Sequence, residues 1–235
     1  MNIKDIINQI EENGFALLDN FLQDNEFESL KNFVDKKINI INKNFFLVDK
    51  SQTKIFIENN DLYNKFYKLF VELIDGNNID ENEKIYRVLR YIKGEQSEEE
   101  SFKFHFDAHH YTILIPIHIP NRDGHDNGDL LIIPNLRKLH KNIFINVLQK
   151  LFYQSSFYRS FLKNNLRKKT KKLQLKTGNI YIINGFRSLH GNLNIHNEDQ
   201  RATILLHFKD VIKDSKLIKI NRFMKQFIES KNIKT

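Results

Sequence analysis

The chain of 235 residues has the length of one domain, or of one domain with a helical elaboration, and can bury a sizeable core. Hydrophobic residues make up 40% and charged residues 28% of it, which is the composition of an ordinary globular protein. Cysteine is absent, so the sequence excludes disulfides, zinc ribbons, iron–sulfur clusters and thiol nucleophiles. Any metal ion must therefore be held by histidine and carboxylate side chains.

The formal net charge is +8, from 37 basic and 29 acidic residues. Such an excess suits an anionic substrate or a nucleic acid, but it is more often a solvated lysine surface, so nucleic acid is the weaker candidate partner. The first 14 residues lack the apolar segment of a secretory signal. No apolar run reaches the length of a membrane span, so we expect a cytoplasmic protein without a membrane partner.

The first part of the chain is predicted to alternate helices with short strands. Apolar residues at helical spacing predict helices over residues 3–13, 24–43 and 60–75. Runs of β-branched and aromatic residues predict strands over residues 15–22, 52–58 and 84–92. A polar, acidic stretch at 94–101 predicts a solvent-exposed loop.

From residue 102 onward the pattern becomes mostly β. Strand-like runs lie at 102–106, 111–119, 129–134, 173–184 and 201–208, separated by turn residues at 121–129 and 194–200. Pro116 predicts an edge strand or a bulge. A last helix is expected at about 213–230.

A lysine-rich stretch at about 136–172 interrupts these strands. Its apolar positions recur at helical spacing and predict one or two amphipathic helices; these positions are Ile143, Val147, Leu148, Leu151 and Phe152. We expect a lid or a dimer contact, with a helix packed on the outer sheet face as an equal alternative. The whole order predicts a single domain, 1–235, mainly β with flanking helices, built as an antiparallel sandwich or jelly roll.

His105 and Asp107 form an H-x-D pair on a strand-like segment. Side chains two positions apart on a strand project from the same face, so both can reach one metal ion. The pair alone is weak evidence, because about one H-x-D or H-x-E is expected by chance in this composition. A second pair, His196 and Glu198, lies in a polar turn and is interpreted as that chance event.

His190 and Arg201 strengthen the prediction of a metal site. His190 follows the strand-like NIYIIN, and Arg201 opens the next run, RATILLHF, beyond a polar turn. If the two strands form a hairpin about this turn, His190 and Arg201 lie side by side. Two histidines and one carboxylate leave coordination positions open, which suits non-haem Fe(II), and a guanidinium can clamp a carboxylate beside them.

The order of H-x-D, a long gap, a distal His and then an Arg resembles the Fe(II)/2-oxoglutarate-dependent oxygenase superfamily. NGFALLDNFLQDNE resembles the helix–strand–helix opening of many members, and GDLLIIPN resembles the strand and turn after the metal strand. LKTGNIYIIN and FRSLHGN resemble the strand before the distal His and the block around it, with Asn179 where members usually have Asp. The resemblance covers most of the chain except 136–172.

The resemblance implies a double-stranded β-helix (jelly roll, cupin-like) core with N-terminal helices and a helical insert. It implies that His105, Asp107 and His190 are the catalytic metal ligands for Fe(II). It also implies that Arg201 binds the distal carboxylate of 2-oxoglutarate and that Thr203, on the same strand face, shares it. The side-chain lining of such a site must keep the cavity dry.

The activity implied is that of a dioxygenase that uses O2 and decarboxylates 2-oxoglutarate to succinate while hydroxylating a substrate. Asp107 favours hydroxylation, because halogenating members usually carry a small residue at this position. The expected substrate is a small metabolite or an amino-acid-like molecule, and it could be anionic. A homodimer is possible.

Further residues near the motif are candidates for contacts with co-substrate or substrate, and each has an ordinary structural role as its alternative: Arg90, Tyr91, His109, His110, Thr112, His118, Arg187 and Ser188. His125, His196 and Glu198 are interpreted as solvated turn residues. The basic run at 167–172 is interpreted as a solvated face, with a polyanion contact as the alternative.

Two other functions stay open. A cupin-type metalloenzyme could use the same ligands without 2-oxoglutarate, and a demand for that co-substrate discriminates. A non-catalytic jelly-roll module could instead bind a polyanion or a protein through its basic face, and the salt dependence of nucleic-acid binding tests this.

Overall fold

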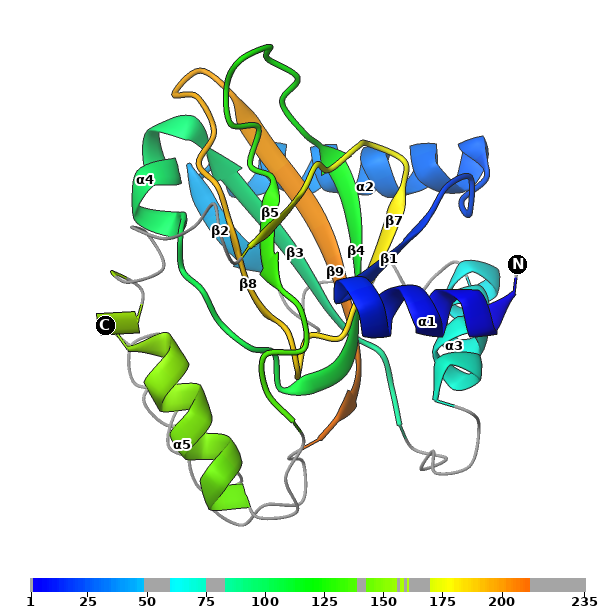
Figure 1. Ribbon diagram of the computed structural model, residues 1–235. Coiled ribbons are helices and arrows are strands. Elements are labelled where there is room, and N and C mark those ends of the chain that lie inside the picture. Colours follow the sequence, from blue (N-terminus) through cyan, green and yellow to red (C-terminus); the bar gives the residue numbers. More distant parts are fainter. Residues whose placement is uncertain are drawn as a thin grey trace, which may run out of the picture.

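The computed structural model describes residues 2–48, 60–74, 83–138, 143–155, 157–158, 160 and 170–211. Two facing antiparallel sheets form the centre of the molecule, and helices cover their outer faces (Figure 1). The strand expected at 52–58 and the helix expected at 213–230 lie outside the described residues. Within the described part, no helix combines the length and the apolar character needed to cross a membrane.

Three N-terminal helices confirm the helical spacing of the sequence: α1 (Ile3–Asn13), α2 (Asp24–Ile41) and α3 (Asn60–Leu73). The side chain of Asn2 caps the start of α1 by accepting a hydrogen bond from the Lys4 backbone N–H at 3.1 Å. Gly14 ends α1 at a φ of 81°, a left-handed conformation that favours glycine.

The larger sheet has six strands in the order β1-β7-β4-β9-β3-β2, and every neighbouring pair is antiparallel. Its strands are β1 (Phe15–Leu18), β2 (Phe45–Val48), β3 (Tyr86–Lys93), β4 (His109–His118), β7 (Ile180–Ile183) and β9 (Gln200–Asp210). The register of β4 with β9 shifts between Pro116 and His118, which confirms the predicted bulge.

The smaller sheet has three strands in the order β6-β5-β8, which are β6 (Lys171–Leu173), β5 (Leu130–Ile133) and β8 (Leu189–Asn192). A 3-10 turn (Gly94–Gln96) and the short helix α4 (Ser97–Glu100) follow β3. Helix α5 (Ile143–Gln154) lies in the predicted insert and confirms its helical spacing.

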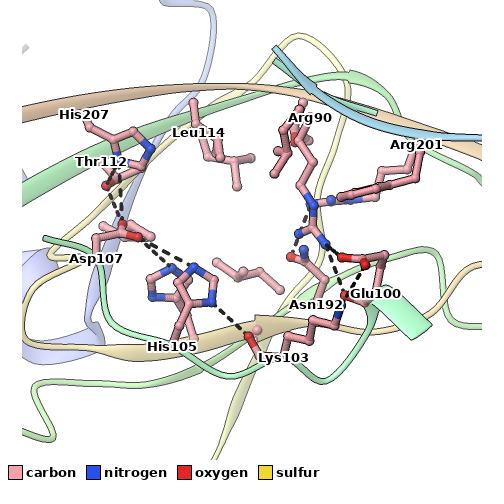
Figure 2. Close-up of a pocket in the computed structure, with 18 residues that line it drawn as sticks. Arg90, Glu100, Lys103, His105, Asp107, Thr112, Leu114, Asn192, Arg201 and His207 are labelled. Carbon is pink, nitrogen blue, oxygen red and sulfur yellow. Dashed lines mark hydrogen bonds and ion pairs between the residues drawn. The ribbon is translucent and has the colours of Figure 1, made fainter. Parts of the chain in front are cut away.

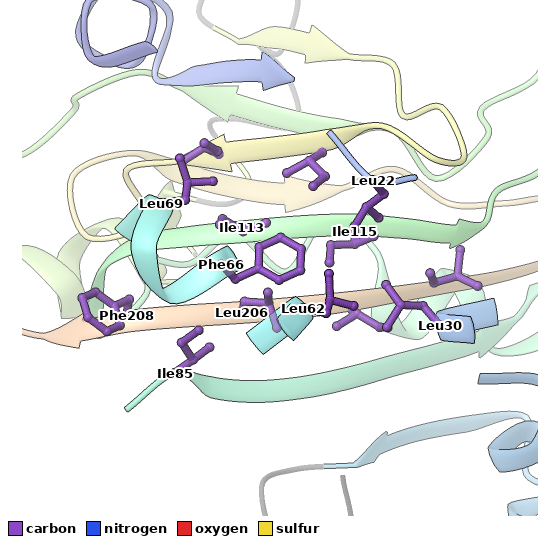
Figure 3. Packing of buried hydrophobic residues seen from close by; sticks show 14 of the residues in the cluster. Leu22, Leu30, Leu62, Phe66, Leu69, Ile85, Ile113, Ile115, Leu206 and Phe208 are labelled. Carbon is purple, nitrogen blue, oxygen red and sulfur yellow. The ribbon is translucent and has the colours of Figure 1, made fainter. Parts of the chain in front are cut away.

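Strand alternation sorts the side chains of the larger sheet into two layers. Ile113 and Ile115 of β4 and Leu206 and Phe208 of β9 face the N-terminal helices and are fully buried. Figure 3 shows them packed with side chains of α3, among them Phe66. The alternate residues of the same strands face the smaller sheet, so the space between the sheets receives a different set of side chains.

The smaller sheet is also two-sided. Leu130 and Ile132 of β5 pack between the sheets, whereas Leu131 and Ile133 pack on the outside. Tyr153 of α5 joins the outer cluster. Tyr153 therefore packs α5 against the outer face of the smaller sheet. A role of the whole insert as a lid or dimer contact stays a prediction.

Three local predictions were wrong, and one strand was missed. Residues 94–101 form helical turns rather than an open loop, and residues 102–106 contribute one isolated β-bridge, at His105, rather than a strand. The run 173–184 is divided between β6 and β7 by a turn, and the strand β2 was not predicted. β2 and the bridge at His105 are short and take their conformation from partners distant in the sequence, β3 and His190.

Candidate metal centre and its cavity

A cavity of about 260 Å³ opens between the two sheets, and every residue predicted for the site lines it. These residues are His105, Asp107, His190, Arg201 and Thr203. In Figure 2, His105 and Asp107 lie at one end of the cavity and Arg90 and Arg201 at the other, with Leu114 between them. The cavity is small for a ligand site, since such pockets are typically about 300–1,000 Å³.

His105 and His190 lie directly opposite one another. Their backbones form an isolated antiparallel bridge, with hydrogen bonds of 2.9 Å and 3.1 Å between the two residues. Each imidazole donates from Nδ1 to a backbone carbonyl, His105 to Lys103 at 2.9 Å and His190 to Ser188 at 3.0 Å. These bonds fix the tautomer that leaves Nε2 free to ligate a metal ion.

Asp107 completes the group. Its Oδ1 lies 3.6 Å from Nε2 of His105 and 3.6 Å from Nε2 of His190. Ligand atoms about 2.1 Å from one ion are at most about 4.2 Å apart, so both pairs can share an ion. Among the described residues, these three make up the group of His and carboxylate side chains arranged to hold a metal, with candidate ligand atoms within 4.8 Å of one another.

The protonation states suit metal binding. Enclosure in the protein lowers the pKa of His105 to about 4, so its imidazole is neutral at pH 7. Burial alone would raise the pKa of Asp107, but His190, His207 and His105, together with a hydrogen bond from Thr112, hold it well below its usual range. The carboxylate is therefore ionised and ready to coordinate a cation.

The other oxygen of Asp107 is held by a hydrogen-bonded chain. Thr112 Oγ1 donates to Asp107 Oδ2 at 2.6 Å and lies 2.8 Å from His207 Nδ1. The Thr112 hydroxyl has one proton and donates it to Asp107. His207 must therefore donate from Nδ1 to Thr112 Oγ1. Figure 2 shows this chain at the end of the cavity opposite the arginines.

Two glycines make room for the site. A Cβ at Gly185 would lie 2.2 Å from Asp107 Oδ2, and the Asp107 backbone N–H donates to the Gly185 carbonyl at 2.9 Å. A Cβ at Gly128 would lie 2.6 Å from Cδ of Arg201, and Gly128 also has a φ of +72°. Both the carboxylate and the guanidinium are therefore seated against bare backbone.

Arg201 is deeply buried at 3% exposure on the cavity face of β9. Its Nη2 donates to Asn192 Oδ1 at 3.3 Å, and its buried Nε has no hydrogen-bond partner among the described residues. Burial and the neighbouring Arg90, opposed by Asp129, lower the pKa of Arg201 to about 9, so it remains a cation at pH 7. A buried cation with an unpaired donor calls for an anion in the cavity.

The predicted hairpin between the strands of His190 and Arg201 was wrong. β8 pairs with β5 in the smaller sheet, whereas β9 pairs with β3 and β4 in the larger one. The turn at 194–200 crosses from one sheet to the other, so His190 and Arg201 face a common cavity across the sandwich.

The further candidates divide into those that line the cavity and those that do not. Arg90 and Thr112 line it. His110 and Arg187 instead line a separate pocket, and Arg187 also pairs with Glu11 at 2.7 Å.

Three others take structural roles: His118 pairs with Asp35, Tyr91 donates to Gln200, and His109 stacks on Tyr86. Ser188 is buried and its Oγ accepts from the Asn135 backbone N–H. His125 and His196 are exposed, lie in two different turns and pack edge to face.

Sequence reasoning missed His207, Asn192 and Glu100, all of which line the cavity. A signal for two of them was available. His207 follows Arg201 by an even number of positions on one strand, and Asn192 follows His190 by two, so strand alternation places each on the same face as its partner. Glu100 lies in the segment interpreted as a solvated loop, and only the fold brings it to the cavity.

No protein-family model matches the sequence, and no curated protein sequence matches it. Solved structures do match. EctD from S. alaskensis superimposes with a TM-score of 0.63 at 11% identity, covering 90% of this chain and 78% of that one. An oxidoreductase of the 2OG-Fe(II) oxygenase family from Burkholderia pseudomallei gives a TM-score of 0.57 at 10% identity, covering 89% and 91%.

A prolyl-4-hydroxylase from Pseudomonas putida is similar over 88% of this chain and 98% of its own, with a TM-score of 0.53 at 10% identity. The mainly β, two-sheet architecture with flanking helices is the jelly roll expected from the sequence. A His–Asp–His group lies in its cavity. The chain therefore has the double-stranded β-helix fold of the Fe(II)/2-oxoglutarate-dependent oxygenase superfamily, as its sequence motifs predicted.

Proposed function

We propose that the protein is an Fe(II)- and 2-oxoglutarate-dependent dioxygenase that hydroxylates a small-molecule substrate. The group of His105, Asp107 and His190 would hold the iron, because two imidazoles and one carboxylate suit Fe(II) and leave coordination positions open. When bound, the metal and co-substrate supply the oxidising chemistry: O2, 2-oxoglutarate and a substrate C–H give succinate, CO2 and a C–OH.

Arg201 and Thr203 would bind the distal carboxylate of 2-oxoglutarate. Their side chains project into the cavity from the same face of β9, and both residues are almost fully buried. A guanidinium offers paired N–H groups that match a carboxylate, and burial strengthens such a pair when its charge is matched. Thr203 has a hydroxyl that can donate to the same carboxylate.

The remaining lining controls solvent and orientation. Leu114, Leu130, Ile183 and Leu205 line the space around the polar groups with aliphatic surface. Such a lining excludes water from a reacting centre and lowers the local dielectric. Asp107 keeps a carboxylate on the metal, which supports hydroxylation over halogenation as the outcome.

The single observation that carries the proposal is the buried guanidinium of Arg201, with its unpartnered Nε, in the same cavity as the His–Asp–His group. A metalloenzyme that acts on a neutral substrate has no use for a cation there, and neither has a binding module that works through its exposed basic face. An anionic co-substrate that also reaches the metal accounts for both features.

Succinate release tests the proposal. Fe(II)-loaded protein should convert 2-oxoglutarate to succinate under O2, with metabolite pools as the source of substrate. His190→Ala should abolish release, and Arg201→Gln should raise the KM for 2-oxoglutarate about tenfold or more, because charged hydrogen bonds contribute about 1.5–3 kcal/mol each. The proposal fails if wild-type protein releases no succinate or if His190→Ala releases as much.

A further inference from the structure

A second arginine, Arg90, faces the cavity from β3, whereas the proposed function assigns the co-substrate carboxylate to Arg201 and Thr203. Its register partners are Thr203 on β9 and Leu47 on the edge strand β2. Both partners and Arg90 itself line the cavity. Figure 2 shows Arg90 and Arg201 extending into it from the same side.

The two arginines differ in depth. Arg201 is 3% exposed, whereas the Arg90 side chain is 16% exposed and its register partner Leu47 is 58% exposed. Arg90 therefore lies toward the cavity opening and Arg201 in its interior. A ligand held by Arg90 can enter after the co-substrate has taken the deeper position.

The charge of Arg90 is only partly compensated. Of its five N–H donors, one on Nη2 donates to the Glu100 carbonyl at 3.1 Å, and the described residues supply no other hydrogen-bond partner. Glu100 Oε2 lies 3.8 Å from Arg90 Nη2, whereas Glu100 Oε1 lies 2.7 Å from Lys103 Nζ. The closer ion pair of Glu100 is therefore with Lys103. Burial lowers the pKa of Arg90 by more than Glu100 raises it.

The charges of the side chains that line the cavity do not sum to zero. The ionised side chains of the lining are the cations Arg90, Lys103 and Arg201 and the anions Glu100 and Asp107, which leaves one positive charge. Asp129, buried near Arg201 but outside the lining, is paired with Lys172 at 3.1 Å and does not change this balance. A divalent metal ion and doubly charged 2-oxoglutarate cancel one another. One positive charge then remains in the loaded cavity, at the Arg90 end.

From this balance we infer that the primary substrate is a small monocarboxylate whose carboxylate is bound by Arg90. The inference rests on the proposed function and specifies the substrate class of the same site. A carboxylate carries one negative charge at pH 7 and matches the planar guanidinium, whereas a phosphate monoester carries about −1.5 to −2. Phe45 and Leu47, which also line the cavity, provide apolar surface for the rest of the molecule.

Matched acid and amide probes test the inference without turnover. Three pairs suit the cavity: N-acetyl-L-leucine with its amide, 3-phenylpropanoate with 3-phenylpropanamide, and hexanoate with hexanamide. Each is titrated into protein loaded with Mn(II) and 2-oxoglutarate, and the paramagnetic relaxation of its protons reports binding near the metal. We expect at least one acid to bind wild-type protein about tenfold more tightly than its amide, the effect of one charged hydrogen bond.

Arg90→Gln should bring the Kd of that acid to within about threefold of the amide's, while the Kd of 2-oxoglutarate changes by less than about threefold. Lys93→Gln is the matched control, since it removes an exposed cation from the same strand and should leave both affinities unchanged. Leu47→Glu places an anion beside Arg90 at an exposed position, so it should weaken binding of the acid but not of the amide. This variant replaces Arg90→Gln as the test if Arg90→Gln does not fold.

The outcomes separate the two proposals. Failure of 2-oxoglutarate to bind metal-loaded wild-type protein overturns the proposed function. If 2-oxoglutarate binds but no acid is preferred over its amide, the substrate inference alone is wrong. It is also wrong if Arg90→Gln weakens 2-oxoglutarate as strongly as the acid, because Arg90 then belongs to the co-substrate site.

Discussion

At the scale of single residues, the orientation of Asp107 depends on Thr112, a contact that the sequence did not reveal. Thr112 holds the oxygen of Asp107 that faces away from the two histidines, and His207 holds the hydroxyl of Thr112. Groups that orient a metal ligand typically change metal affinity 10- to 100-fold when they are removed, a range of about 1.4–2.7 kcal/mol.

Thr112→Val should therefore weaken metal binding about 10- to 100-fold, because valine keeps the shape of threonine but cannot donate to Asp107. Competition between the protein and a fluorescent chelator for Mn(II) or Co(II) measures the affinity. Thr177→Val, at an exposed turn, is the control and should bind as wild type does. Equal affinities for Thr112→Val and wild type would show that Asp107 needs no such support.

Gly128 makes room for Arg201, at the end of the cavity opposite the metal-binding group. Gly128→Ala should weaken 2-oxoglutarate binding to metal-loaded protein about tenfold or more, because the new Cβ would collide with Arg201 Cδ, 2.6 Å away. Gly124→Ala is a close control: its φ is +73°, against +72° at Gly128, and its Cβ would meet nothing within 4 Å. Both variants carry backbone strain of about 1–3 kcal/mol, so only the difference between them measures the collision. Calorimetric titration with equal Kd values for the two variants would contradict this account.

At the scale of elements, strand alternation explains most of the site. On β9, Arg201, Thr203, Leu205 and His207 face the cavity, while the residues between them face the helices. The sequence therefore predicted that Arg201 and Thr203 face the same site, because both lie on one strand at alternate positions. It did not predict that β8 and β9 belong to different sheets, because a turn of the same length can close a hairpin or cross between sheets.

The helix layer is anchored on the reverse face of the same strands. Phe70 of α3 is fully buried and stacks on Phe208 of β9, with ring centroids 4.8 Å apart. Phe70→Ala should lower the free energy of unfolding by about 3–5 kcal/mol, since it removes a large core side chain. Leu148→Ala, on the exposed face of α5 at 65% exposure, should change it by less than about 0.5 kcal/mol. Urea denaturation measures both, and a loss below about 1 kcal/mol for Phe70→Ala would mean that α3 contributes little to the core.

At the scale of the whole molecule, His190 on the smaller sheet, with His105 bridged to it, and Arg201 on the larger sheet meet only because the sandwich closes. His105, Asp107, His190, Arg201 and Thr203 were predicted from motif order and resemblance, and the fold brings all five to one cavity. Arg90 and Glu100 gain their significance from burial and charge, which a sequence without a fold does not display. The single-domain assignment, the lid or dimer role of the insert and a homodimer stay predictions.

Titration of 2-oxoglutarate into Mn(II)-loaded protein by calorimetry tests the central claim most directly. The account predicts one 2-oxoglutarate bound per chain, no measurable binding to metal-free protein or to the double variant His105→Ala/His190→Ala, and a rise in Tm with ligand concentration by mass action. Binding of equal strength without the metal, or no binding at millimolar 2-oxoglutarate, would contradict it.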